Sequence, residues 1–256
     1  MALIDGTDLR DILTGSSSAD TINGLAGDDI LFGLAGNDTL SGGGEDDIID
    51  GGSGNDTINT GAGNDFILGG TGNDTIVGMA GSDIVFGGAG NDTVAWNDPI
   101  GDRVFGDAGN DILRGGDIAA DTIFGGSGDD LIRAVANQSI TVHASDKLFG
   151  DAGRDTLIGS NVGDLLDGGT GNDTMAGFGG ADRFVFQKGG SGNDLIVDFD
   201  KSQDVIDLTG CGGAFDPLDE LQDTASGVRL NLGGGNHITF LGVTAGELTE
   251  ANFFIA

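Results

Sequence analysis

Several kinds of residue are scarce in this chain of 256 residues, and each scarcity excludes a kind of protein or site. Cys211 is the only cysteine, so the chain can form neither an internal disulfide bond nor a zinc site built from cysteines. The two histidines, His143 and His237, give little support for a histidine-based transition-metal site or a catalytic pair. Two prolines exclude a proline-rich disordered tract. No apolar run approaches the ~18 residues that a membrane-spanning helix needs.

Positive charge is also scarce, because ten Lys and Arg residues face 42 Asp and Glu residues. The formal net charge of −32 makes nucleic acid and anionic membrane surfaces poor partners. It also makes a compact state repel itself, and 52 glycines add a large entropic cost of ordering. Regularly placed Ile, Leu, Val and Phe nevertheless argue against simple disorder. We therefore expect bound cations to stabilise the folded chain.

One pattern with a period of nine residues runs through most of the chain. An aspartate recurs at each period, and a bulky aliphatic residue follows two positions later, as Leu31 follows Asp29. Glycines precede each aspartate, so the unit reads G-G-x-G-[N/D]-D-x-U-x, where U is aliphatic. The regular series of aspartates comprises Asp11, Asp20, Asp29, Asp38, Asp47, Asp56, Asp65, Asp74, Asp83 and Asp92.

Later copies are less regular. One extra residue precedes Asp102, another precedes Asp121, and a larger insertion at residues 134–145 precedes Asp146. Regular spacing then returns from Asp155 to Asp182. The pattern divides the chain into repeats at 1–185 and a different segment at 186–256.

The unit predicts an all-β fold, a right-handed parallel β-roll (β-solenoid) with a C-terminal β cap. Three residues, x-U-x, make a short strand, and the six glycine-rich residues reverse the chain. Two units complete a coil of 18 residues, so equivalent strands stack about 4.8 Å apart in each of two parallel sheets. The U side chains meet inside as a thin core. A helix is excluded because a period of nine does not fit it and glycine is a poor helix former.

Stacking would also place the aspartates in two columns, one from each side of the roll. Neighbouring carboxylates ~5 Å apart repel by roughly 0.8 kcal/mol in bulk water and ~3 kcal/mol at an effective dielectric of 20. Such columns need cations between the coils. Only oxygen ligands are available, from carboxylates and turn carbonyls, and they favour a hard cation. Ca²⁺ fits best, because it accepts six to eight oxygens in flexible geometry.

Two other interpretations of the aspartates are weaker. Aspartates that merely form solvated turns would not be required at one position in nearly every copy. An EF-hand is excluded because no bidentate glutamate stands at its twelfth loop position and no amphipathic helices flank the loops.

From Asp11 to about Asp182 the chain closely resembles the repeats-in-toxin (RTX) family, whose repeats bind calcium. The resemblance implies that each ion lies between a turn and the turn one coil later. The first turn gives its second and fourth carbonyls and its aspartate; the second turn gives its first and third carbonyls and its aspartate. The first implied site comprises Leu25, Gly27 and Asp29 with Gly42, Gly44 and Asp47.

Further sites implied by the resemblance follow the same scheme, although Glu45 replaces a glycine and is expected to strain its turn. They comprise Leu34, Gly36 and Asp38 with Gly51, Ser53 and Asp56; Gly43, Glu45 and Asp47 with Thr60, Ala62 and Asp65; Gly52, Gly54 and Asp56 with Gly69, Thr71 and Asp74; Gly61, Gly63 and Asp65 with Gly78, Ala80 and Asp83; and Gly70, Gly72 and Asp74 with Gly87, Ala89 and Asp92. Asp20, Asp111, Asp130, Asp155 and Asp173 are expected to add metal ligands.

The segment from Gly179 onward is similar to the segment that closes the β-roll of serralysin-like proteases. Its alternating runs at 228–232 and 237–241 predict antiparallel strands. A cap is needed because the last coil would otherwise expose an unpaired edge. The ending at 250–256 resembles an uncleaved signal for type I export, and it also fits a last capping strand. Met1–Asp5 has neither a basic nor an apolar region, so we expect no Sec signal peptide.

The two outer faces differ. One carries threonines every 18 residues, from Thr21 to Thr93, which could suggest ice binding but also simply favour strands. The other is expected to be apolar, and such a face usually marks an interface. We expect it to pack against a protein partner, a second copy or the returning C-terminal segment. Its residues are Ile30, Phe32, Ile48, Phe66, Leu68, Ile84 and Phe86.

These observations favour a non-catalytic module that binds several Ca²⁺ ions and folds outside the cell after leaving through a type I secretion apparatus. An enzyme is disfavoured because neither H-E-x-x-H nor G-x-S-x-G occurs. Two alternatives stay open: a carbohydrate-binding module like that of alginate epimerases, and a host-interaction protein that perturbs membranes. Arg103, Arg114, Arg133 and Arg154 are too scattered to decide for the former.

Overall fold

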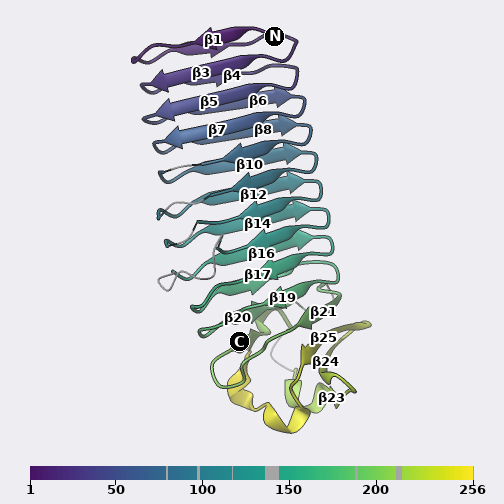
Figure 1. The fold of residues 1–256 in the computed structure, drawn as a ribbon. Helices are drawn as coiled ribbons and strands as arrows, with labels where there is room; N and C mark the ends of the chain where they lie inside the picture. Colours follow the sequence, from purple (N-terminus) through teal and green to yellow (C-terminus); the bar gives the residue numbers. More distant parts are fainter. Residues whose placement is uncertain are drawn as a thin grey trace.

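The computed structural model describes residues 1–78, 80–96, 99–116, 118–135, 144–187, 190–211 and 215–255. Within them the chain winds into a long roll of two facing sheets, of fourteen and twelve strands (Figure 1). Successive strands alternate between the sheets, and equivalent strands of consecutive coils pair in parallel, as Ile22 of one coil pairs with Leu40 of the next. The predicted all-β parallel roll is confirmed.

The odd-numbered strands form the larger sheet. In chain order they are β1 (Leu3–Asp5), β3 (Thr21–Ala26), β5 (Thr39–Gly44), β7 (Thr57–Ala62), β9 (Thr75–Val77), β11 (Thr93–Ala95), β13 (Ile112–Arg114), β15 (Leu131–Arg133), β17 (Thr156–Ile158), β19 (Thr174–Ala176) and β21 (Asn193–Ile196), to which β25 (Asn236–Leu241), β24 (Gly227–Gly233) and β23 (Leu221–Asp223) are added at the end.

The even-numbered strands form the other sheet. They are β2 (Ile12–Thr14), β4 (Ile30–Phe32), β6 (Ile48–Ser53), β8 (Phe66–Thr71), β10 (Ile84–Ala89), β12 (Arg103–Ala108), β14 (Thr122–Ser127), β16 (Lys147–Ala152), β18 (Leu165–Asp167), β20 (Arg183–Val185), β22 (Val205–Asp207) and β26 (Phe253–Phe254).

The core is the single line of aliphatic side chains between the two sheets. From Ile22 onward each U residue, such as Leu31, Leu40 and Ile49, is fully buried, because side chains alternate between the two faces of a strand. Several strands are twice the predicted length of three residues. In these coils the second and third turn residues also pair with the next coil, as Leu25 pairs with Gly43.

The outer face of the even-numbered sheet carries the predicted apolar residues. Ile30, Ile48, Phe66 and Ile84 lie in register on consecutive strands. Further along the same sheet Phe86, Phe105, Phe124 and Phe149 stack with ring centroids 4.7, 4.9 and 4.7 Å apart and nearly parallel planes. The C-terminal segment lies at the end of the roll rather than over this face (Figure 1), so the expectation that it covers the face is wrong.

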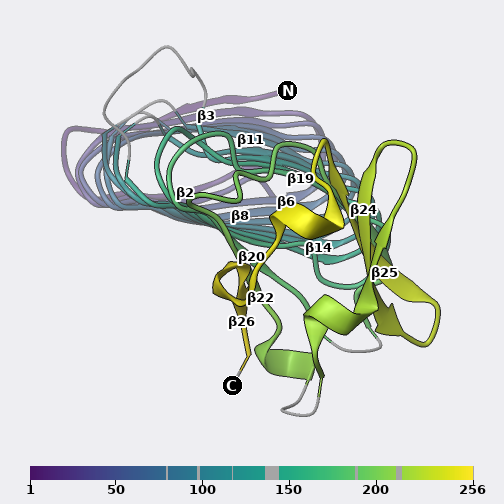
Figure 2. The same cartoon turned by 90° about the horizontal axis from the view of Figure 1, so that it is seen from below.

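The C-terminal segment instead extends both sheets. β21 pairs in parallel with β25, which pairs with β24 in the predicted antiparallel manner, and β26 pairs in parallel with β22. Seen from below, the segment lies at this end of the roll and extends beyond one side of it (Figure 2). Short 3-10 turns at Thr209–Cys211, Pro217–Glu220, Ala245–Glu247 and Glu250–Asn252 join these strands.

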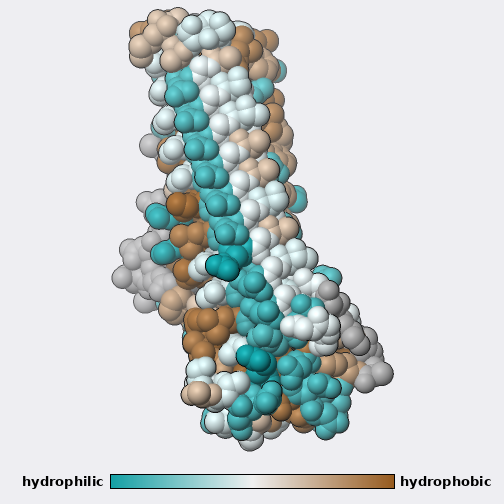
Figure 3. Space-filling view, turned by 90° about the vertical axis from the view of Figure 1, so that its right-hand side faces the viewer, coloured by the Kyte–Doolittle hydropathy of each residue, from teal (hydrophilic) through white to brown (hydrophobic). Residues whose placement is uncertain are grey.

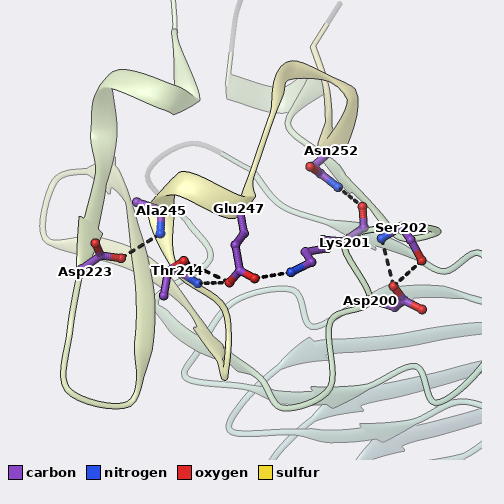
Figure 4. Close-up of polar contacts among 8 residues, drawn as sticks. All are labelled: Asp200, Lys201, Ser202, Asp223, Thr244, Ala245, Glu247 and Asn252. Carbon is purple, nitrogen blue, oxygen red and sulfur yellow. Dashed lines mark hydrogen bonds and ion pairs between the residues drawn. The ribbon is translucent and has the colours of Figure 1, made fainter.

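Polar contacts join parts of this C-terminal segment to one another (Figure 4). Asn252 is buried, and its Nδ2 donates to the carbonyl of Lys201 at 2.8 Å. Lys201 forms an ion pair with Glu247, and the backbone N–H of Ala245 donates to Asp223 at 2.7 Å. Within the described ranges, none of the helices is both long and apolar enough to cross a membrane.

Candidate metal centres

The aspartates of the repeat lie in two columns, one on each side of the roll. The turns that follow odd-numbered strands hold Asp29, Asp47 and Asp65; those that follow even-numbered strands hold Asp38 and Asp56. We call these the odd column and the even column. Figure 3 faces the even side, where a hydrophilic stripe runs the length of the roll. The exposed side chains of that side include Asn37, Asn55, Asn73, Asn91 and Asn110.

One carboxylate oxygen of each aspartate is used to join consecutive coils. The backbone N–H of Asp38 donates to Oδ1 of Asp56 at 2.7 Å, and that of Asp29 donates to Oδ1 of Asp47 at 2.8 Å. The same bond recurs from Asp130 to Asp155 across the insertion at 134–145, of which residues 136–143 lie outside the described ranges. The columns are therefore continuous along the roll.

The other oxygen, Oδ2, is buried and has no hydrogen-bond partner in most of these aspartates. A buried ionised carboxylate without a partner is costly, since it has lost its hydration and gained nothing in exchange. Within the described residues, the aspartates with an unpartnered Oδ2 include Asp29, Asp38, Asp47, Asp56, Asp65, Asp74, Asp92, Asp111, Asp130, Asp155, Asp173, Asp182 and Asp194.

Burial is the main cause of the raised pKa values in the columns. The pKa of Asp47, Asp56 and Asp74 is raised to about 6 and that of Asp155 to about 8, by burial first and to a smaller extent by neighbouring aspartates in the columns. The backbone N–H bond to Oδ1 opposes this rise in each case. A cation beside Oδ2 would favour the ionised carboxylate and so offset the effect of burial and of the neighbouring aspartates on its pKa.

The first residue of a turn is a glycine because oxygens converge there. A Cβ added to Gly24 would lie 2.5 Å from Oδ2 of Asp29 and 2.4 Å from the carbonyl oxygen of Gly42 in the next coil. At Gly51 the corresponding distances to Oδ2 of Asp56 and to the oxygen of Gly69 are 2.7 and 2.5 Å. A carboxylate and a carbonyl thus meet beside a position that must have no side chain.

The second and fourth residues of these turns have positive φ. Gly52 and Gly54 adopt φ of 95° and 126°, which glycine does without strain. Leu25 (83°), Leu34 (76°) and Glu45 (68°) adopt the same region with a side chain, which costs energy. Oε2 of Glu45 accepts a hydrogen bond from the N–H of Gly27 at 2.6 Å, which helps to hold this turn.

The turn carbonyls at the predicted positions line the gap between coils. The carbonyl of Ser53 accepts one backbone hydrogen bond, from Gly36, so a second lone pair stays available on its oxygen. The carbonyl of Leu34 accepts the backbone N–H of Ser53 and, at 3.4 Å, the hydroxyl of the same residue. The same backbone hydrogen bonds between consecutive coils recur elsewhere: the N–H of Ala80 donates to the carbonyl of Gly61, and the N–H of Gly72 donates to the carbonyl of Ala89. In the described part of the chain no three His, Cys, Asp or Glu side chains converge. Backbone carbonyls would therefore supply most ligands, a donor set that fits Ca²⁺.

Three residues depart from the predicted ligand set. Asp20 was expected to bind metal, but its Oδ1 accepts from Ala2 and its Oδ2 from Ser16, and these bonds lower its pKa. Conversely, Asp182 and Asp194 have an unpartnered Oδ2 and were not predicted as ligands. Asp182 keeps the nine-residue spacing, and Gly192-Asn193-Asp194 repeats the local G-N-D pattern, so both signals were present in the sequence.

Comparison with known families gives one extensive match. The sequence model of the RTX calcium-binding nonapeptide repeat (4 copies) matches residues 5–40, 32–67, 59–94, 100–132, 144–161 and 158–196. These ranges together span well over half of the chain. No curated protein sequence matches.

The solved structures that resemble the chain include an antifreeze protein, a lipase and a subunit of an epimerase. The hyperactive, Ca²⁺-dependent, β-helical antifreeze protein from an Antarctic bacterium is 23% identical with a TM-score of 0.52, covering 78% of this chain and 75% of its own; this likeness supports the fold. The extracellular lipase LipA from Serratia marcescens is 20% identical with a TM-score of 0.43, and the match covers 98% of this chain but only 39% of the lipase. The AlgE6R3 subunit of the Azotobacter vinelandii mannuronan C5-epimerase is 26% identical with a TM-score of 0.28, covering 54% of this chain and 78% of that one.

Proposed function

Since this chain belongs to the family of RTX calcium-binding nonapeptide repeats and binds calcium, we propose that it is a secreted, non-catalytic module whose roll folds when Ca²⁺ enters the aspartate columns. Calcium would be held between consecutive coils by the paired aspartates and turn carbonyls described above. It supplies positive charge that the chain itself lacks. The segment 1–185 is the metal-dependent roll and 186–256 is its cap.

The observation that carries this proposal is the buried Oδ2 without a partner, repeated along both columns. Each aspartate is almost fully buried, Asp29 and Asp47 being only 1% exposed. A roll without metal therefore contains a row of desolvated carboxylates beside one another. Metal binding then contributes directly to the free energy of folding. The chain is unfolded without metal and folds into the roll when calcium binds.

The dependence on calcium also suggests where folding takes place. RTX repeats are typical of secreted proteins, and extracellular calcium is abundant whereas cytosolic calcium is scarce. A chain that stays unfolded inside the cell can leave through a type I secretion apparatus, which would recognise the C-terminal residues 250–256. After export, β26 would become the last rung of the even-numbered sheet, beside β22.

Far-UV circular dichroism of chelator-stripped protein during a calcium titration tests the proposal. We expect a steep transition from coil to β structure in the sub-millimolar to millimolar range, and no such transition with magnesium, which prefers a tighter octahedral site. A complete β spectrum in excess chelator at neutral pH would contradict calcium-driven folding. Absence of β structure with either ion would contradict the metal sites themselves.

A further inference from the structure

Not every repeat leaves an oxygen free for a cation. In some turns a backbone N–H at the start of the same turn donates to Oδ2 of the aspartate. These bonds run from Thr7 to Asp11 (2.6 Å), from Ser16 to Asp20 (2.7 Å), from Gly116 to Asp121 (2.8 Å) and from Ser160 to Asp164 (2.6 Å). We call these self-capped turns. Turns whose aspartate has an unpartnered Oδ2 are open turns.

The backbone at the second position of the turn separates the two classes. In open turns of the standard six residues this residue has positive φ, whether it is Gly52 (95°), Asp107 (70°) or Phe178 (67°). The second residues of the self-capped turns, such as Ser16 and Ser160, do not have positive φ. A positive φ at this residue turns its backbone N–H away from the carboxylate of the same turn. The φ angle of this residue therefore determines whether its own backbone N–H donates to Oδ2 or whether Oδ2 needs a different partner, such as a cation.

We propose that calcium occupies only the gaps between open turns, and that the self-capped turns are repeats without a metal site. This inference rests on the proposed function, because it says which repeats perform it. In the self-capped turns after the first coil both carboxylate oxygens already accept backbone hydrogen bonds: Asp164 accepts from Asp146 at Oδ1 and from Ser160 at Oδ2. Such a turn is satisfied without metal.

The two columns then differ in calcium content. In the even column the turns are open without interruption from Asp38 to Asp173. In the odd column they are open at Asp29, Asp47, Asp65 and Asp182 but self-capped at Asp11, Asp121 and Asp164. Oδ2 of Asp204, the next aspartate after Asp182, likewise accepts a backbone N–H, from Asp200 at 2.7 Å. Calcium would therefore form one unbroken row on the even side and a broken row on the odd side.

Trp96 interrupts the odd column in a second way. It stands where most turns begin with glycine, and its side chain is almost fully buried. A Cβ added to Gly78, one coil earlier, would meet the Trp96 ring at 2.9 Å, whereas one added to Gly24 or Gly51 meets oxygens. Carbon atoms thus fill the position in which a carboxylate and a carbonyl converge elsewhere. We assign no metal to this gap.

The test compares Asp56→Asn with Asp164→Asn in the full chain. Both aspartates are buried, and Oδ1 of each accepts a backbone N–H from the preceding coil, at 2.7 and 2.8 Å. They differ at Oδ2, which is unpartnered in Asp56 and bound to Ser160 in Asp164. Bound calcium is counted by equilibrium dialysis with atomic emission. Asp56→Asn should lose one or two ions per chain, because it borders two gaps, and Asp164→Asn should lose none.

Equal losses in the two variants would overturn the distinction between turns while leaving calcium binding intact. A native chain that binds no calcium would instead contradict the proposed function. If Asp56→Asn does not fold, Asp47→Asn provides a second open position, in the same column as Asp164 and between the open turns of Asp29 and Asp65. Asp20→Asn provides a second self-capped one, and it should retain the native calcium count.

Discussion

The backbone N–H of Asp38 donates to Oδ1 of Asp56, one coil later, while Oδ2 of Asp56 is buried without a partner. The two oxygens of one side chain therefore have two tasks. Oδ1 joins two coils by a hydrogen bond, and Oδ2 provides a negatively charged ligand for a cation. The coil-to-coil bond and the metal site are thus inseparable along the column.

Replacement of Asp74 by Ala should remove both tasks. The N–H of Asp56, which donates to Oδ1 of Asp74 at 2.7 Å, would be left buried and unpaired. The unpaired N–H alone should cost about 1–3 kcal/mol, and the calcium midpoint of folding should rise several-fold. Asn73→Ala is the control, because Asn73 is exposed and water can replace its bond to Asn91. A calcium titration followed by circular dichroism measures both; similar midpoints for the two variants would contradict the prediction.

The core of one coil can be tested with two neighbouring isoleucines of β6. Ile49 is fully buried and Ile48 is 43% exposed on the outer face. Ile49→Ala should lower the free energy of unfolding in calcium by about 2–5 kcal/mol, since it removes buried methyl groups and leaves a cavity. Ile48→Ala should cost far less. Urea unfolding of both variants at saturating calcium measures the difference; a large loss for Ile48→Ala would instead indicate that a partner covers this face.

Two glycines of adjacent turns should respond oppositely to alanine. A Cβ at Gly51 would lie 2.5 Å from the oxygen of Gly69 and 2.7 Å from Oδ2 of Asp56, so Gly51→Ala should displace both groups and weaken calcium binding. A Cβ at Gly44 meets nothing within 4 Å, and Gly44 does not have positive φ. Gly44→Ala should stabilise the protein slightly, by about 0.4–1 kcal/mol, because it restricts the unfolded chain. Thermal unfolding in calcium measures both, and a destabilised Gly44→Ala would contradict the geometry of this turn.

Acid should partly replace calcium. In the metal-free roll the pKa of Asp47, Asp56, Asp65 and Asp74 is raised from 3.8 to about 6. The folded form then binds more protons than the unfolded chain between these values, so its stability rises as the pH falls through about 6 and is lost as the pH rises again. Circular dichroism in excess chelator should show more β structure at about pH 5 than at about pH 7.5. Calcium affinity should decrease as the pH falls from about 7.5 to about 5, because protons compete with calcium for the same carboxylate oxygens. A calcium affinity independent of pH would contradict the raised pKa values.

The sequence predicted the roll because its nine-residue period positions every side chain. Once two units form a coil, residues such as Leu31 and Leu40 must face inward, and Asp38 and Asp56 must stack. This required only the alternation of strands and the spacing of residues. The antiparallel pairing of β24 with β25 followed in the same way from alternating polarity.

The two classes of turn could not be predicted, because residue type does not determine φ at the second position. Leu25 and Ser16 occupy equivalent positions and both have side chains, but only Leu25 adopts positive φ. The choice depends on hydrogen bonds to the neighbouring coil, as between Leu25 and Gly43, which appear only when the coils are stacked. The stacked rings of Phe86 and Phe105 have the same origin: spacing places them in one row, but only packing sets the angle between the rings.

The extra residues before Asp102, Asp121 and Asp146 all follow odd-numbered strands, namely β11, β13 and β15. The opposite side, with its unbroken series of open turns, keeps the standard unit from Asp38 to Asp173. From Asp38 to Asp173 the turns on one side of the roll therefore have a constant length, whereas turns on the other side contain additional residues. A peptide tag or guest domain inserted after β15 would leave the series of open turns in register, whereas the same insertion after β14 would divide it.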